Sequence, residues 1–132
     1  MSMLLKILKI ILISFFSFNL ISSEKENYGC DLGFESIVEK KICVKNLENN
    51  EDRKLGLMNL EKLSKFHQVN FIWNGKRKIR CMWMKNTSIP LDILFVDRIK
   101  FVIEKGEPFS EKKICHPAIK VIEANRGELL AC

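Results

Sequence analysis

The segment over residues 81–97 constrains the fold of this chain more than any other. It reads CMWMKNTSIPLDILFVD, two apolar stretches separated by the polar corner at residues 85–88. Side chains alternate between faces along an extended chain, so Met82 and Met84 share one face and their neighbours occupy the other. Because both faces are mostly apolar, the segment predicts strands buried on both sides, as in a small closed barrel or a helix-covered sheet.

Turn signals around this segment predict hairpins. Asn74-Gly75 separates two predicted strands, 69–73 and 76–84, and this dipeptide favours a two-residue hairpin turn. The polar pair Asp97-Arg98 similarly predicts that the strand after Pro90 pairs with a strand over 99–104.

The remaining segments predict a mainly β (α+β) domain, a small barrel-like fold with one short helix. The helix lies within residues 47–58, where Asn49 or Asn50 can cap it and Gly56 can end it. The other predictions are a strand or hairpin over 33–44, a charged loop over 105–117, a last strand over 118–124 and the opening of a helix over 125–132.

The first 23 residues have the pattern of a secretory signal peptide. Lys6 and Lys9 precede an apolar run, residues 10–21, which ends in Ser22-Ser23. An uncleaved N-terminal anchor over residues 4–23 is the alternative, because about 20 residues can span a bilayer. We therefore expect an exported protein, periplasmic or secreted, with a linker over residues 24–33 and the β-rich domain over 34–132.

Charge gives little indication of a nucleic-acid partner. The chain of 132 residues has room for one domain, and its formal net charge is +6. Without the leader, 20 basic side chains face 16 acidic ones. One basic run, residues 76–80, is typical of a solvated hairpin flank, and it lacks the interleaved aromatic residues of single-strand binders. We expect no nucleic-acid partner, and contact with a membrane only through an uncleaved leader.

Export would place the cysteines in an oxidising compartment. Five are available, and their spacing favours none of the fifteen ways to form two disulfides; free buried thiols remain an alternative. No C-x-x-C pair supports a zinc ribbon or a thioredoxin-like motif. The five are Cys30, Cys43, Cys81, Cys115 and Cys132.

Three blocks of this sequence resemble, in order, the signature blocks of the bacterial and archaeal family called domain of unknown function 192. They lie at residues 53–58, 82–97 and 121–127, and the likeness extends over 34–132. The resemblance implies a small β-rich barrel, often behind a signal or anchor, and no established activity. Two departures are the end of the chain at Cys132, which suggests a shortened member or a truncated sequence, and Ser88, where many members have leucine.

Asp92 is the principal candidate for a site residue, because it stands among apolar residues where an unpaired charge is costly. Lys85, Asn86 and Thr87 at the corner, and Arg53 from the helix, are its candidate partners. In one interpretation the corner's backbone N–H groups and Thr87 satisfy Asp92, which then only holds the corner together. In the other, these residues form a pocket that binds a small polar or anionic ligand.

Two further functions are compatible with the sequence, copper(I) binding and catalysis. Met82 and Met84 share a strand face and could bind copper(I) through their soft sulfur atoms, although methionines two residues apart on an apolar strand are usually core residues. An enzyme could use Asp92, but no nucleophile motif supports one. Its candidate residues would be Cys81 or Cys115 with His67 or His116 and Asp92, or Asp92 with Glu104 or Glu123, although alternating acids on strands are usually at the surface.

The sequence therefore predicts an exported binding or interaction module without a cofactor. Its partner would be a small polar ligand or a protein, and its site would lie around Asp92 and the corner at residues 85–87.

Overall fold

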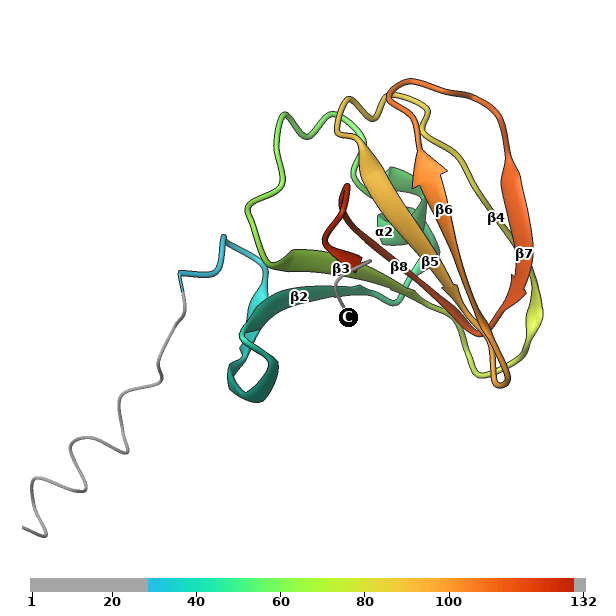
Figure 1. Ribbon diagram of the computed structural model, residues 1–132, viewed down its shortest axis with the longest axis horizontal. Helices are drawn as coiled ribbons and strands as arrows, with labels where there is room; N and C mark the ends of the chain where they lie inside the picture. Colours follow the sequence, from blue (N-terminus) through green and yellow to red (C-terminus); the bar gives the residue numbers. More distant parts are fainter. Residues whose placement is uncertain (1–28, 130–132) are drawn as a thin grey trace, which may run out of the picture.

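Eight strands and one α-helix arrange the chain over residues 29–129, the part that the computed structural model describes (Figure 1). The predicted signal peptide, residues 1–23, lies outside these residues, as does Cys132. The elements are β1 (Glu35–Ile37), a 3-10 turn (Val38–Lys40), β2 (Ile42–Leu47), α2 (Asn50–Leu55), β3 (His67–Ile72), β4 (Lys78–Met82), β5 (Leu91–Val96), β6 (Phe101–Gly106), β7 (Ile114–Ala118) and β8 (Lys120–Asn125).

The strands form two sheets, so the predicted β-rich class is confirmed. Six strands pair in the order β1-β2-β3-β8-β5-β6, and β4 pairs with β7 alone. The pairing of β2 with β3 is parallel, with α2 in the connection between them, and the other pairings are antiparallel. The β4–β7 sheet stands at the opposite side of the molecule from β1 and β2 (Figure 1). The expected closure into a barrel does not occur, because the larger sheet ends at β1 and β6.

Helix α2 forms where its capping residues predict it. The side chain of Asn49 accepts a hydrogen bond of 2.8 Å from the backbone N–H of Asp52, which satisfies one of the free donors of the first turn. Gly56 ends the helix with φ of +48°, a conformation that favours glycine. A Cβ atom at this position would also lie 3.2 Å from the ring of Phe71, so the glycine lets α2 approach β3.

Strand β5 is covered on both faces, as its sequence predicts. Leu91, Ile93 and Phe95 are fully buried in the hydrophobic core, and Asp92 on the other face is also fully buried. Strand β4 and the two residues after it are buried on one face only. Met82 and Met84 lie in the core, while Cys81 and Trp83 are exposed. The prediction of burial on both faces is therefore wrong for residues 78–84, since no further layer within residues 29–129 covers the outer face of the two-stranded sheet.

The hairpin predicted at Asn74-Gly75 is wrong. Strand β3 already has β2 and β8 as its neighbours, so no edge of β3 remains for the strand that follows it. The chain turns at Gly75, where φ is +70°, and β4 crosses to pair with β7 instead. A turn dipeptide reflects only the local backbone conformation, so it gives no information on whether the preceding strand is already paired on both edges.

Two other hairpins are confirmed, and one strand was missed. β1 pairs with β2 within the region predicted as a strand or hairpin, and β5 pairs with β6 across the Asp97-Arg98 turn. The predicted charged loop over 105–117 contains the start of β7, which carries Pro117. Proline and charged residues are tolerated there because β7 has a neighbour only on one side. Residues 126–129 form a turn after β8, and no α-helix begins within them.

Two disulfides join Cys30 to Cys43 and Cys81 to Cys115. The second lies between directly opposed residues of β4 and β7. This pairing is one of the fifteen arrangements that the spacing leaves open. Disulfides are typical of proteins from an oxidising compartment. Over residues 29–129, no helix combines the length and the apolar character needed to cross a membrane.

Candidate functional site

An open groove of about 860 Å³ lies against α2 and the end of β4. Three of the five residues predicted for a site, Arg53, Lys85 and Asn86, line it. Thr87 and Asp92 are not among its lining residues. The other lining residues are Asn50, Glu51, Lys54, Leu55, Met58, Phe71, Trp73, Cys81, Met82 and Trp83.

Two tryptophans supply the flat apolar surfaces of this groove, and they are the only tryptophans of the chain. Trp73 stacks with Phe71 at a centroid distance of 6.4 Å, and its ring lies 4.3 Å from the guanidinium carbon of Arg80. Trp83 is 39% exposed, with the ammonium nitrogen of Lys85 5.2 Å from its ring centroid. Sequence reasoning assigned neither tryptophan to the site, although their placement on either side of the predicted turn was a usable signal.

Arg53 is held at the groove by two hydrogen bonds that leave part of its guanidinium free. Its Nη1 donates to the carbonyl of Ile72 at 2.7 Å, and its Nη2 donates to Oδ1 of Asn50 at 2.6 Å. A guanidinium has five N–H donors, so donors remain for a ligand. The bond to Ile72 also joins α2 to the end of β3, next to Trp73, whose ring centroid is 5.6 Å from Arg53 Cζ.

The groove is electropositive. Three of its lining side chains are cationic, Arg53, Lys54 and Lys85, and one is acidic, Glu51. Burial, and then repulsion from Arg53, lowers the pKa of the Arg80 guanidinium below its usual value, although Arg80 remains a cation near neutral pH. Repulsion between these two cations over Trp73 would be relieved by an anion, which is the property expected of an anion-binding site.

The corner at residues 85–87 presents Lys85 and Asn86 from a backbone that its own hydrogen bonds hold. Asn86 has φ of +54°, a conformation that asparagine tolerates better than most residues, and its carbonyl accepts a bond of 2.8 Å from Asn59. Buried Thr87 donates through its hydroxyl to the carbonyl of Lys85 at 3.1 Å and through its N–H to Met84. Thr87 therefore shapes the corner from inside.

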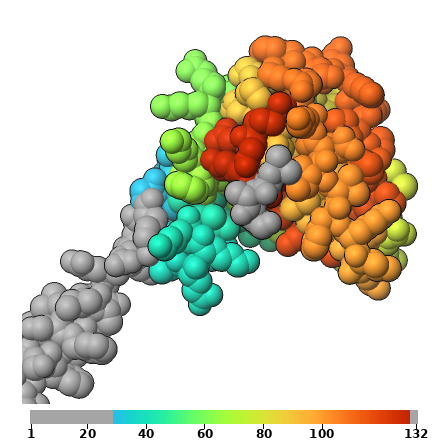
Figure 2. Space-filling model, in the orientation of Figure 1, coloured from blue at the N-terminus to red at the C-terminus, as the bar shows by residue number. Residues whose placement is uncertain are grey.

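Asp92 lies on the side of the sheet covered by the turn after β8, not at the corner. Its Oδ2 accepts hydrogen bonds from the backbone N–H groups of Gly127 at 2.8 Å and Leu129 at 3.3 Å. Figure 2 shows this turn, in red, on the surface between the green loop and the orange strands. The expectation that the corner and Thr87 satisfy Asp92 is therefore not met, because residues 35 or more positions away supply the donors.

Arg126 completes this arrangement. Its Nη2 donates to the carbonyl of Gly106 at 2.8 Å and its Nε to that of Leu91 at 3.3 Å, while Asp92 Oδ1 lies 3.9 Å from Nε. The turn thus joins the ends of β5, β6 and β8. Asp92, which the sequence predicts as a site residue, therefore holds this turn in place together with Arg126.

The residues considered for catalysis or copper binding are engaged elsewhere. Cys81 and Cys115 are bonded to each other, so neither is a free nucleophile. Nε2 of His116 forms a hydrogen bond of 3.0 Å with Oε1 of Glu104. Met82 and Met84 both pack in the hydrophobic core, and Met84 fills the space beside Gly106, where a Cβ atom would lie 2.6 Å from its sulfur.

Glu123, interpreted from sequence as a surface acid, is buried in the middle of the sheet. It is only 4% exposed, and its neighbours across the strands are the core residues Val69 and Ile93. Burial raises the pKa of its carboxyl to about 8. It does not line the groove, so its effect is on stability rather than on ligand binding.

Comparison with protein families and structures places this architecture among known folds. The model of the family of domain of unknown function 192, described as an uncharacterized ACR, matches residues 34–132. A crystal structure from Sinorhizobium meliloti 1021, of a protein described as a candidate transcription regulator, is 30% identical with a TM-score of 0.60, over 68% of this chain and 73% of that one. A second structure, a protein of unknown function from Novosphingobium aromaticivorans DSM 12444, is 20% identical with a TM-score of 0.59, over 83% and 91%. Comparison with curated proteins gave no match.

Proposed function

Because this chain belongs to the uncharacterised family of domain of unknown function 192, whose name carries no activity, we propose a function from the groove itself. The protein is an exported binding module that takes a small anionic ligand with a flat apolar body. The observation that carries this proposal is the meeting of both tryptophans with Arg53 and Lys85 in one groove.

The chemistry of the groove favours this class of ligand. Indole rings bind flat apolar groups, and free guanidinium and ammonium donors bind carboxylates and phosphates. A volume of about 860 Å³ is within the range of small-molecule sites. Asn86 adds a side-chain amide that can donate or accept a hydrogen bond.

A nucleic-acid ligand is less well supported. The Sinorhizobium relative is described as a candidate transcription regulator, and the corresponding surface here would be the basic run at residues 76–80. Two cations of this run are already engaged. Arg77 pairs with Asp97 at 2.8 Å, and Arg80 lies over Trp73. Fewer cations of this run are therefore free to contact a nucleic-acid backbone.

Intrinsic fluorescence gives a direct test, because both tryptophans of the chain line the groove. We expect benzoate and phenyl phosphate to change the emission with saturation, and the neutral isostere benzamide to bind more weakly. The variants Arg53→Gln and Lys85→Gln should each weaken binding of the anions by about tenfold or more, since a hydrogen bond to a charged group contributes ~1.5–3 kcal/mol.

A matched control is Lys65→Gln, which removes an exposed lysine that does not line the groove and should leave the affinity unchanged. Binding of benzamide as tight as that of benzoate, or unaltered binding by both groove variants, would contradict the proposal. A saturable response to a duplex oligonucleotide alone would favour the competing assignment.

Export rests on the leader and on the two disulfides. We expect the full chain, expressed in a bacterium with a periplasm, to be recovered from the periplasm or medium with residues 1–23 removed. Intact-mass measurement should also show four cysteines protected from alkylation without reductant. Recovery in the cytoplasm with the leader attached and all thiols reactive would exclude this part of the proposal.

A further inference from the structure

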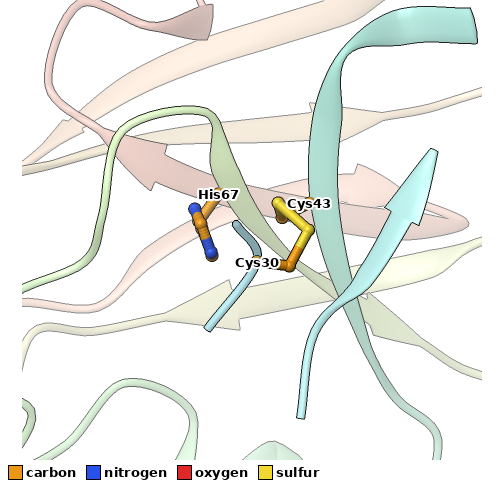
Figure 3. A group of neighbouring side chains, drawn as sticks. All are labelled: Cys30, Cys43 and His67. Atoms are coloured by element: carbon orange, nitrogen blue, oxygen red, sulfur yellow. A yellow bond between two sulfur atoms is a disulfide. The ribbon is translucent and has the colours of Figure 1, made fainter. Parts of the chain in front are cut away.

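A second cluster, none of whose members lines the groove, brings two cysteines and a histidine together near the start of the domain. Figure 3 shows the disulfide Cys30–Cys43 with the ring of His67 beside it. The two sulfur atoms and a ring nitrogen all lie within 4.8 Å of one another. Cys43 and His67 are register partners in the parallel pair β2–β3, so the backbone holds their relative positions.

The hydrogen bonds of His67 determine its tautomer. Nδ1 lies 2.9 Å from the carbonyl oxygen of Lys65, which can only accept, so Nδ1 carries the proton. Nε2 accepts from the backbone N–H of Asp31 at 2.9 Å, so Nε2 carries the lone pair. A histidine whose Nδ1–H is held by a carbonyl while Nε2 is basic is in the form that binds metals.

Asp31 can supply a fourth ligand. Oδ2 of Asp31 lies 3.8 Å from His67 Nε2, and the hydroxyl of Ser64 donates to this oxygen at 2.6 Å. His67 is itself 3% exposed, with Phe34 packed edge-on against its ring at 4.8 Å. The cluster therefore has a buried imidazole, a carboxylate that another residue orients and two sulfur atoms.

We propose that reduction of the Cys30–Cys43 disulfide converts this cluster into a Zn²⁺ site with Cys30, Cys43 and His67 as ligands and Asp31 or water as the fourth. In a tetrahedral site with Zn–S of ~2.3 Å and Zn–N of ~2.0 Å, ligand atoms are ~3.5–3.8 Å apart. The spacing here approaches that geometry once the sulfur atoms separate. The metal takes the place of the Asp31 N–H at Nε2.

The redox step requires a dithiol as reductant. The dithiol transfers two electrons and two protons to the disulfide, becomes a disulfide itself and leaves two thiols on the protein. Zn²⁺ then displaces both thiol protons into solvent and binds the two thiolates. The oxidised protein and the zinc-bound protein are alternative states of one cluster, which links metal binding to the redox poise of the surroundings.

The test uses the purified protein reduced with dithiothreitol, desalted without oxygen and titrated with Co²⁺ and then Zn²⁺. We expect one equivalent of Co²⁺ to give the absorption of sulfur-to-metal charge transfer, Zn²⁺ to displace it, and the oxidised protein to bind neither. The Cys30→Ser variant should lose the signal, and His67→Gln should weaken Zn²⁺ binding by at least ~10-fold.

The matched controls are the double variant Cys81→Ser/Cys115→Ser and the single variant Cys132→Ser, both of which should bind as the unmodified protein does. Because His67 is buried, circular dichroism checks the fold of its variant, and Cys30→Ser changes only a half-buried residue. Zn²⁺ should also protect Cys30 and Cys43 from alkylation in the reduced protein. Absence of a stoichiometric signal in the reduced protein, or a signal that Cys30→Ser leaves intact, overturns the proposal.

Discussion

Replacing Glu123 by glutamine should remove a large loss of stability at neutral and alkaline pH. The carboxyl has a pKa of about 8 in the folded protein and 4.5 in a solvated reference, because it is buried in the sheet. Each pKa unit corresponds to ~1.4 kcal/mol, so full ionisation lowers the free energy of unfolding by about 3–5 kcal/mol. We expect Glu123→Gln to be more stable than the unmodified protein by this amount at pH 9.

The sign follows from proton binding. Between pH 4.5 and 8 the folded state holds a proton on Glu123 that the unfolded state has released, so stability falls as pH rises through this window. Below pH 4.5 Glu123 is protonated in both states, so its ionisation no longer lowers the free energy of unfolding. Glutamine resembles the protonated acid in shape and polarity, so the two proteins should have similar stability near pH 4.5.

Urea unfolding at pH 5 and pH 9 measures the effect as a difference between the two proteins, which removes contributions from other titrating groups. The exposed acid Glu111 provides a control, because Glu111→Gln should track the unmodified protein at both pH values. If the free energy of unfolding changed equally between pH 5 and pH 9 for Glu123→Gln and the unmodified protein, Glu123 would be solvated in the folded state.

Replacing Asp92 by alanine should destabilise the protein by about 3–5 kcal/mol, since a buried acceptor of two backbone N–H groups is lost beside Arg126. The N–H groups of Gly127 and Leu129 would be left without this acceptor under the turn. Differential scanning calorimetry should record a fall in Tm of more than ~10 °C.

Asp92→Asn separates the roles of shape and charge at this position. It keeps an oxygen in place of Oδ2 and should recover part of the lost stability. Binding of benzoate to Asp92→Ala, measured well below its Tm, should match that of the unmodified protein, because Asp92 does not line the groove. If Asp92→Ala melted like the unmodified protein but no longer bound benzoate, Asp92 would belong to the ligand site.

Much of the local structure could be predicted from the sequence. Asn49 and Gly56 bound the helix because a side-chain cap and a positive φ are local requirements. The apolar run at residues 91–96 forms an interior strand, between β8 and β6, because only burial on both faces suits it. The predicted site residues Arg53, Lys85 and Asn86 do line one groove, although the acid expected among them is elsewhere.

The sequence by itself therefore determined the β-rich class, the helix and its ends, the two hairpins with local signals and the family. Only the tertiary structure decided that β4 pairs with β7 and not with β3, that four cysteines pair as they do, and that the turn after β8 donates to Oδ2 of Asp92. Capping and alternation depend on neighbours in the chain, whereas these pairings depend on which strand edges and faces remain free once the other elements have packed.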